Sequence, residues 1–370
     1  MSLHSTTDVF VVGGGPSGLA AAIAARQKGF DVTLADGAAP PIEKPCGEGM
    51  MPETIAALRD LGVAIGPADG VNFRGICFAQ GDARVESDFP SGVGVGLRRT
   101  TLHERLVARA GDCGVKLLWK SPVVAIGARF VELVAGRVSA RWIIGADGQS
   151  SRVRRWSGIA TKHIRRRYAT RRHFRMRPWS SYVEIHWSAF SQAYVTPVGP
   201  NEVCIVILAA SSEHASFEQA LREFPEIRDK IFGAEMTSRE RGAVTAMHTL
   251  RRVQRANVAL VGDASGGVDA ITGEGIRLGL RQAAALAEAM VAGNLRNYER
   301  QHRALARRPS RTGRLMLWLD RNPKTRARVI LALQNKPELF ARTLAIHVGR
   351  SSPREVILTG AQLGWRLLAA

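Results

Sequence analysis

The N-terminal segment combines two apolar runs with one Ala-rich stretch. Asp8–Val12 is rich in β-branched and aromatic residues, which predicts a buried strand. The Ala-rich stretch Leu19–Lys28 predicts a helix that ends at Gly29. Val32–Leu34 is the second apolar run, and Asp36 closes it. The pattern therefore predicts a complete βαβ unit at the start of the chain.

Later segments show both helical and strand periodicity. Helices are predicted over 52–61, 99–110 and 275–291, and strands over 73–78, 83–88, 142–144 and 258–261. Between 164 and 208 apolar and polar residues alternate, which predicts half-exposed antiparallel strands. From about Asn294 onward the pattern is helical, with breaks expected at Pro309, Pro323, Pro337 and Pro353. The succession of elements is typical of an α/β protein.

Composition and charge narrow the class of protein. With 370 residues, 45% hydrophobic and 23% charged, the chain is predicted to be globular, with more than one domain and fewer than three. Lys and Arg exceed Asp and Glu by 52 − 32 = 20, mostly as arginines between 165 and 177 and along 302–328. Such a surface favours an anionic partner: nucleic acid, anionic lipid or an acidic carrier of the substrate. The alternative is a solvated basic face without a partner.

The sequence contains no pattern that predicts a membrane-spanning helix, a signal peptide or a metal site. No apolar run reaches the roughly 18 residues that a membrane-spanning helix needs. Met1–Asp8 lacks the order of a signal peptide, so a cytoplasmic location is expected. The four cysteines at 46, 77, 113 and 204 form no C-x-x-C pair, so neither a metal site nor a disulfide framework is expected.

A glycine motif between the first strand and the first helix carries the strongest chemical signal. Gly13, Gly15 and Gly18 have G-x-G-x-x-G spacing. The first glycine suits a tight turn, the second a close approach of a pyrophosphate, and the third close packing of helix on strand. Asp36, at the end of the second strand, is placed to accept the ribose hydroxyls of an adenosine. The unit predicts a dinucleotide site.

Three further segments resemble motifs of one enzyme superfamily. They are Arg99–Leu106 (R-x-x-L-x-x-x-L), Gly145–Arg154 (G-A-D-G-x-x-S-x-x-R) and Gly262–Ala264 (G-D-A). Together with the glycine motif, they resemble the FAD-dependent monooxygenase and geranylgeranyl reductase superfamily. This superfamily includes the group A flavoprotein monooxygenases with the para-hydroxybenzoate hydroxylase fold. The resemblance runs from Asp8 to about Met290.

The resemblance implies FAD as cofactor and a set of residues that hold it. Arg99 would contact the pyrophosphate and Asp263 the ribityl chain, unless Asp263 only caps a helix or turn. Asp36 and Asp147 would also bind FAD. The implied fold is α/β: a Rossmann-like FAD-binding domain of the GR2 type, an antiparallel β-sheet substrate domain and C-terminal helices. The expected bounds are 1–75, 96–160 and 250–295 for the FAD-binding domain, 76–95 and 161–249 for the substrate domain, and 296–370 for the helical region.

Two segments resemble the geranylgeranyl reductase branch more closely. Lys44–Gly49 is similar to its K-x-C-G-x-G segment, and Gly262–Ile276 to its G-D-A-A-G…P-I-T-G-E-G-I segment, although Ala270 replaces the proline. The likeness implies that several residues surround the flavin, namely Cys46, Gly47, Gly273, Gly275 and Ile276. Cys46 is a candidate active-site thiol or a small buried residue. Asp269 is a candidate acid or base that faces the flavin ring, or a turn residue.

These motifs favour an FAD-dependent monooxygenase that acts on a small aromatic or polyketide-like substrate. NAD(P)H would be a transient electron donor and O2 the second substrate, because no second glycine motif offers a nicotinamide domain. The alternative is a reductase of prenyl double bonds whose arginine-rich C-terminal helices rest on an anionic membrane. A third hypothesis is a non-enzymatic basic adaptor for membranes or nucleic acid, although no motif for specific nucleic-acid recognition is present.

One strand offers candidates for the wall of the substrate pocket. Tyr182, Glu184 and His186 share a face of the predicted strand, and Trp187 points the other way. Either that face covers the flavin, or it belongs to ordinary sheet packing with a wet outer surface.

Overall fold

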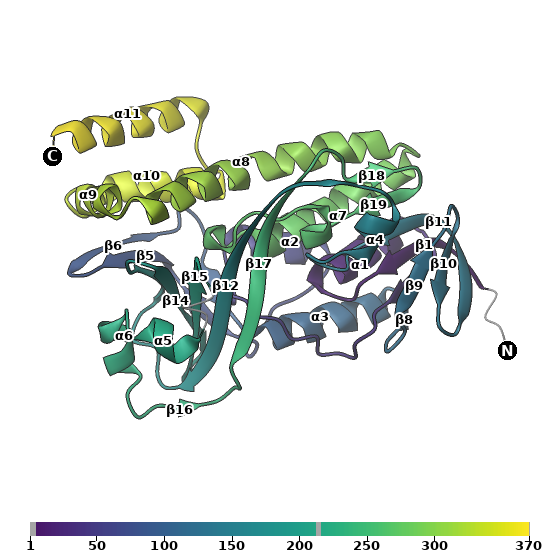
Figure 1. Cartoon of the computed structure of the whole chain (residues 1–370), viewed down its shortest axis with the longest axis horizontal. Coiled ribbons are helices and arrows are strands. Elements are labelled where there is room, and N and C mark those ends of the chain that lie inside the picture. Colours follow the sequence, from purple (N-terminus) through teal and green to yellow (C-terminus); the bar gives the residue numbers. More distant parts are fainter. Residues whose placement is uncertain (1–4, 212–215, 370) are drawn as a thin grey trace.

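The computed structural model describes residues 5–211 and 216–369. Two large sheets follow one another along the long axis of the molecule, and helices cover both (Figure 1). This arrangement of a Rossmann-like part, an antiparallel sheet and C-terminal helices confirms the predicted fold class.

The first sheet contains the predicted βαβ unit. Its strands are β1 (Ser5–Val12), β2 (Val32–Ala35), β8 (Lys116–Leu118), β9 (Val123–Ile126), β10 (Phe130–Leu133), β11 (Gly136–Gly145), β18 (Gln254–Arg255) and β19 (Val258–Leu260). The order β19-β11-β1-β2-β8 is parallel throughout, and β9, β10 and β18 join in antiparallel pairs. The carboxyl ends of β1 and β2 therefore meet at one edge.

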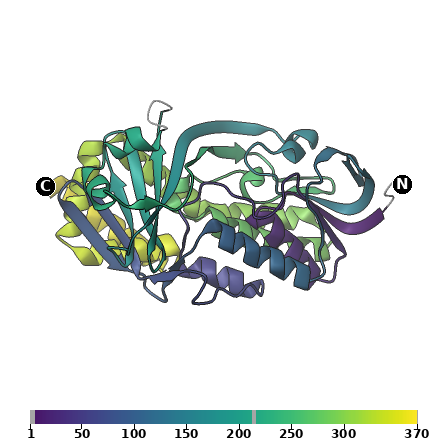
Figure 2. The same ribbon diagram turned by 90° about the horizontal axis from the view of Figure 1, so that it is seen from below.

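Alternation along β1 buries both faces of this sheet. Val9 and Val11 join one apolar cluster with side chains of several helices, whereas Phe10 and Val12 join another with β9 and β10. The helices of the first cluster include α1 (Pro16–Gln27), α2 (Pro52–Asp60), α3 (Arg99–Asp112) and α7 (Gly275–Val291). Figure 2 shows α1, α3 and α7 gathered beneath the sheet at the N-terminal end of the molecule. The short helix α4 (Arg152–Trp156) packs in the second cluster.

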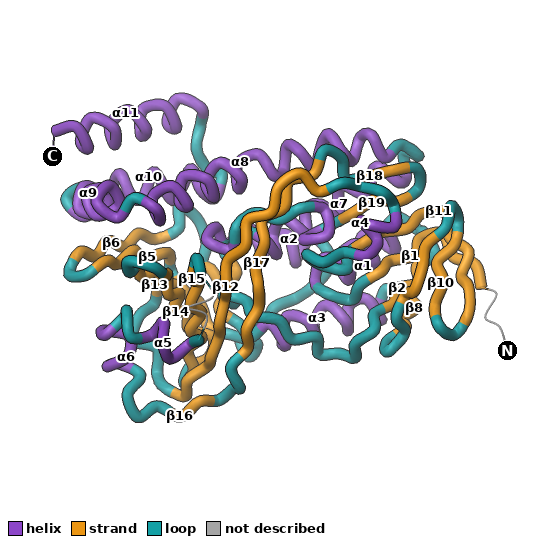
Figure 3. Tube along the Cα trace, viewed as in Figure 1, coloured by secondary structure: helices purple, strands orange, loops and turns teal. Residues whose placement is uncertain are grey.

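The second sheet is antiparallel except where β13 pairs with β5. Its strands are β5 (Gly75–Gln80), β6 (Ala83–Asp88), β12 (Thr161–Arg175), β13 (Tyr182–Trp187), β14 (Ser191–Gly199), β15 (Glu202–Ala209), β16 (Glu235–Met236) and β17 (Arg241–Leu250). The order is β16-β12-β15-β14-β13-β5-β6, and β17 pairs with β12. The long ribbon of β12 and β17 reaches from this sheet toward the first one (Figure 3). A small third sheet contains β3 (Gly49–Met50), β4 (Val71–Phe73) and β7 (Gly94–Gly96).

The expectation of half-exposed strands is wrong for the centre of this sheet. Every residue of β13 is buried, as are nearly all residues of β14 and β15. The short helices α5 (Phe217–Leu221) and α6 (Pro225–Lys230) cover one face, and C-terminal helices cover the other. Most polar positions that produced the alternation are therefore buried and do not face solvent.

The C-terminal region consists of α8 (Leu295–Arg321), α9 (Pro323–Gln334), α10 (Pro337–Val348) and α11 (Pro353–Ala369). The last three begin at the predicted prolines, whose fixed φ suits the first turn. The break predicted at Pro309 is wrong, because Pro309 lies buried inside α8. One turn later Gly313 allows a close approach: a Cβ there would lie 3.2 Å from Thr272 Cγ2. Among the described helices, none combines the length and apolar character required to cross a bilayer.

Candidate cofactor and substrate site

The glycine turn between β1 and α1 has the geometry that its three glycines predict. Gly13 has φ of +109°, and a Cβ on Gly18 would lie 1.9 Å from Gly13 O, so a larger residue would clash there. A Cβ on Gly15, in contrast, would meet no described atom within 4 Å, and Gly15 lies on a cavity wall. The amino end of α1 carries no acidic residue in its first turn. This open cradle fits a diphosphate held by helix N–H groups.

Asp36 and His103 fix the turn from two sides. The Asp36 carboxylate accepts hydrogen bonds from Gly14 N at 2.7 Å and from Ala38 N at 2.8 Å. His103 Nε2 lies 2.8 Å from Gly14 O, and because a carbonyl only accepts, the ring nitrogen donates. Burial lowers the pKa of His103, which keeps the ring neutral. Asp36 also lines the cavity, where its remaining lone pairs could accept hydrogen bonds from a ligand.

Arg99, the first residue of α3, is the basic residue placed to bind a phosphate in the cavity. Arg99 is 9% exposed and lines the cavity wall, and its Nε has no hydrogen-bond partner among the described residues. A buried guanidinium N–H without a partner is costly unless a ligand supplies the acceptor. This orphaned donor beside the glycine cradle fits the pyrophosphate of a dinucleotide.

The segment after β19 closes the opposite side of the site. It forms two 3-10 turns, η2 (Gly262–Ser265) and η3 (Ala270–Thr272), and then enters α7. Asp263 Oδ2 accepts a charge-assisted hydrogen bond from Lys44 Nζ at 2.9 Å. Gly273, Gly275 and Ile276 line the cavity, so the positive end of the α7 dipole lies at its wall. That end favours a ligand that gains negative charge on reduction.

One continuous cavity of about 760 Å³ joins these elements. At one end it is lined by the glycine turn, Asp36, Arg99 and Asp263. At the other end it lies against the second sheet and the C-terminal helices, where the walls are apolar; examples are Ile76, Val183, Ile185, Leu208 and Phe340. Every residue predicted to bind the cofactor lies on this wall except Gly18, which lies behind the turn.

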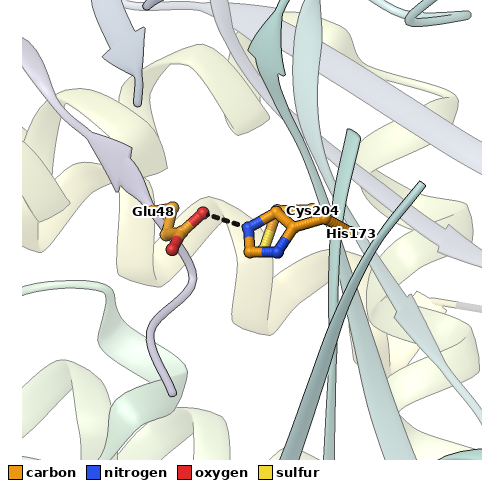
Figure 4. Close-up of side chains that lie close together, drawn as sticks. All are labelled: Glu48, His173 and Cys204. Carbon is orange, nitrogen blue, oxygen red and sulfur yellow. Dashed lines mark hydrogen bonds and ion pairs between the residues drawn. The ribbon is translucent and has the colours of Figure 1, made fainter. Parts of the chain in front are cut away.

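The loop that carries Cys46 and Gly47 is clamped by Glu48, a residue that the sequence analysis did not single out. Glu48 has φ of +59° and a side chain that is 1% exposed. Its carboxylate accepts from Arg99 N at 3.0 Å and Arg171 Nη1 at 3.1 Å, and lies 2.7 Å from His173 Nε2 (Figure 4). Glu48 stands inside the quoted Lys44–Gly49 segment, but its partners on β12 are more than a hundred positions away and leave no local signal.

Glu48, His173 and Cys204 bring three metal-binding side-chain types within 4.8 Å of one another. The combination resembles a zinc donor set. However, the buried guanidinium of Arg171 already balances the Glu48 carboxylate, and its charge would repel a dication. Burial also raises the pKa of the Cys204 thiol well above its usual value, which disfavours the thiolate ligand. The cluster is better explained as a clamp than as a metal centre.

Asp147 and Asp269 have contacts that differ from their predicted roles. Asp147 lines the cavity, but its oxygens accept from Ser151 Oγ and from two amides at the start of α4, so it holds that turn. Asp269 is 3% exposed and absent from the cavity wall; it accepts from Ile271 N and pairs with Arg167 at 3.1 Å. These contacts fit the turn interpretation of Asp269, and a position facing the flavin ring stays a prediction.

The pocket-facing side of β13 is the opposite of the one proposed from the sequence. Val183 and Ile185 line the cavity, whereas Tyr182, Glu184 and His186 point away from it. Glu184 is fully buried and accepts hydrogen bonds from Arg84, Trp179 and His186. Tyr182, Glu184 and His186 are each at most 8% exposed, so this outer face is a packed polar network and not a solvated surface. Tyr194 of β14 does reach the cavity.

The sequence and the fold of this chain are similar to those of known flavoproteins and reductases. Residues 6–297 match the family described as an FAD binding domain. The menaquinone reductase of Mycobacterium tuberculosis (strain H37Rv) is 31% identical over 317 residues, which cover 78% of this chain and 77% of that protein. The digeranylgeranylglycerophospholipid reductase of Methanocella arvoryzae is 27% identical over 316 residues, 74% of each chain. A solved flavin-dependent brominase superposes with a TM-score of 0.79 at 18% identity, covering 98% of this chain and 99% of its own, which shows a shared fold.

Proposed function

We propose that this chain, which belongs to the FAD binding domain family, reduces carbon–carbon double bonds in a long apolar substrate of the prenyl type. The family makes the chain an FAD-dependent oxidoreductase. The observation that carries the proposal is the apolar compartment, which continues directly from the phosphate cradle.

The chemistry of that compartment suits a hydrocarbon chain. Its described lining residues from β5, β13, β15 and α10 include no carboxylate and no Lys or Arg. The polar groups that β14 and α10 add are Tyr194, Thr196, Thr343 and His347. Burial lowers the pKa of His347, so its ring stays neutral. A small polar acid would find no charged partner here, whereas an apolar chain gains from burial.

The residues of the chain divide the work around the cofactor. Bound FAD, reduced by NAD(P)H as the proposed donor, supplies two electrons and one hydrogen to the double bond, and a second proton comes from an acid or water. Gly15 and Arg99 would hold the pyrophosphate, Asp36 the adenosine ribose, and Asp263 with Lys44 the ribityl chain. The α7 amino end would stabilise the reduced cofactor, and Cys46 lies at the cavity wall as a candidate thiol. The printed names of the two reductases support the same reaction class.

An anaerobic single-turnover assay tests the proposal. The purified holoprotein is reduced chemically without oxygen and mixed with a prenylated quinone or a prenyl alcohol, and the products are weighed by mass spectrometry. A gain of two hydrogens per turnover is expected. Product that forms only after oxygen is admitted, and that gains one oxygen atom, would instead establish the monooxygenase that the motifs favoured first.

A further inference from the structure

One face of α8 carries arginines at helical spacing. The exposed positions recur at steps of three and four residues, so they point the same way. The face, which we call the α8 face, consists of Arg300, Arg303, Arg307, Arg311, Arg314, Leu315, Trp318 and Arg321. In Figure 1 this helix runs along the upper side of the molecule, with α11 above its left end.

The positive charge of the α8 face is largely uncompensated. Arg303 pairs with Glu299, and the other arginines of the face form no ion pair with any described residue. The second arginine-rich stretch, 165–177, differs, because Arg167 and Arg171 are buried in ion pairs and Arg172 pairs with two glutamates. Ion pairs therefore neutralise several arginines of 165–177, although Arg166 and Arg177 stay exposed, whereas the charge of the α8 face is mostly unpaired.

Two apolar side chains lie among these arginines, beside the cavity. Leu315 is 53% exposed and Trp318 is 50% exposed. Leu315 also lines the cavity, together with Thr312 and Met316 of the same helix. A side chain that is half exposed and still lines a cavity marks a mouth. The mouth thus opens at the edge of the α8 face, next to the apolar compartment.

We propose that the α8 face docks on an anionic lipid bilayer and that the substrate enters the cavity from the bilayer past Leu315. Arginines bind lipid phosphates, while Trp318 and Leu315 insert at the boundary between headgroups and chains. An acidic protein or a nucleic acid would use the charges but give no role to apolar groups at an apolar mouth. The docking stands on the α8 face alone; substrate entry rests on the proposed reductase function.

Vesicle flotation tests the docking without any enzyme assay. The holoprotein should float with vesicles of phosphatidylglycerol and phosphatidylcholine and stay behind with phosphatidylcholine alone, and salt should weaken the association. Each basic side chain near an anionic surface strengthens binding about fivefold, so R307Q/R311Q should weaken binding by about twenty-five-fold. Trp318→Ser should also weaken vesicle binding, because it removes the ring that would insert between the headgroups. Trp318 is not on the cavity wall, so this change leaves the cavity lining intact.

A matched variant separates local docking from net charge. K116Q/R129Q removes the same charge from exposed positions at the β8–β10 end and should bind as the unaltered protein does. Three outcomes would overturn the proposal. They are equal binding of the protein to both vesicle types, a failure to bind anionic vesicles, and the same loss of affinity in the two double variants. Flavin absorbance and thermal melting show that each variant is folded.

Activity then separates docking from the proposed reaction. If both hold, R307Q/R311Q loses turnover of vesicle-embedded substrate and keeps turnover of the same substrate in detergent. Wild-type flotation with no turnover in either medium would sink the reductase assignment and leave the docking intact. Turnover in detergent without flotation would overturn the docking and leave the reductase intact.

Discussion

Single residues decide whether the cradle can receive a phosphate, and Gly15 is the clearest case. A side chain there would meet no described atom of the protein within 4 Å, so it would occupy the space left for the ligand. Gly15→Val should therefore fold normally and lose FAD affinity by at least about a hundredfold, because its methyls block close backbone approach. Flavin titration followed by fluorescence measures the loss.

The comparison variant for that test is Gly111→Ala. Gly111 lies in α3, also with nothing near its would-be Cβ, but away from the cavity wall. It should keep FAD affinity and gain up to about 1 kcal/mol of stability from helix propensity. Full FAD binding by Gly15→Val would show that the pyrophosphate does not approach this turn.

Glu48 tests whether the loop of Cys46 depends on a buried charge. Glu48→Gln leaves Arg171 and His173 without the carboxylate that both contact inside the protein. Breaking a buried ion pair from one side costs about 3–5 kcal/mol of unfolding free energy. Urea unfolding should show this loss, whereas Glu226→Ala, which breaks the exposed pair with Lys230, should cost about 0.5 kcal/mol or less. Equal effects in both variants would contradict the clamp.

At the scale of elements, the buried carboxylate of Glu184 in strand β13 should make the stability of the protein fall in acid. Burial would raise the pKa of this carboxyl, but hydrogen bonds from His186, Arg84 and Trp179 outweigh it and lower the pKa from 4.5 to about 2. A lowered folded pKa gives stability that is complete above the unfolded pKa and is lost as pH falls from 4.5 toward 2. One pKa unit corresponds to about 1.36 kcal/mol, so Glu184 contributes about 3 kcal/mol to the free energy of unfolding above pH 4.5.

Glu184→Gln isolates that contribution. The variant should be less stable at neutral pH, and its unfolding free energy should fall less steeply than that of the parent between pH 4.5 and 2. Chemical unfolding at several pH values gives both slopes. Parallel slopes would mean that other carboxyls carry the acid sensitivity.

The elements also show which features a sequence can predict. The glycine turn and the helix 275–291 were predicted correctly, because their signals lie within a few residues: turn glycines, capping and periodicity. Burial of Glu184 and the pairing of Asp269 with Arg167 depend on neighbours about a hundred positions away. Pro309 was misjudged for the same reason, since it lies buried inside α8, which packs on η3. Local pattern therefore predicts the elements, and tertiary packing decides which polar groups reach the site.

At the scale of the whole molecule, the cavity joins segments that are far apart in the chain. Its walls come from the glycine turn, the loop of Cys46, α3, the 263–276 segment and the C-terminal helices. A dinucleotide that fills it would contact several of these at once and stabilise only the folded state. Removing FAD should therefore lower the melting temperature. Adding FAD back at a hundredfold excess over its Kd should raise the free energy of unfolding by about 2.7 kcal/mol. AMP, which fills only the cradle near Asp36, should need a far higher concentration for the same shift. Scanning calorimetry of the apoprotein against increasing FAD measures this, and a melting temperature that stays constant across the titration would mean that the cavity does not hold the cofactor.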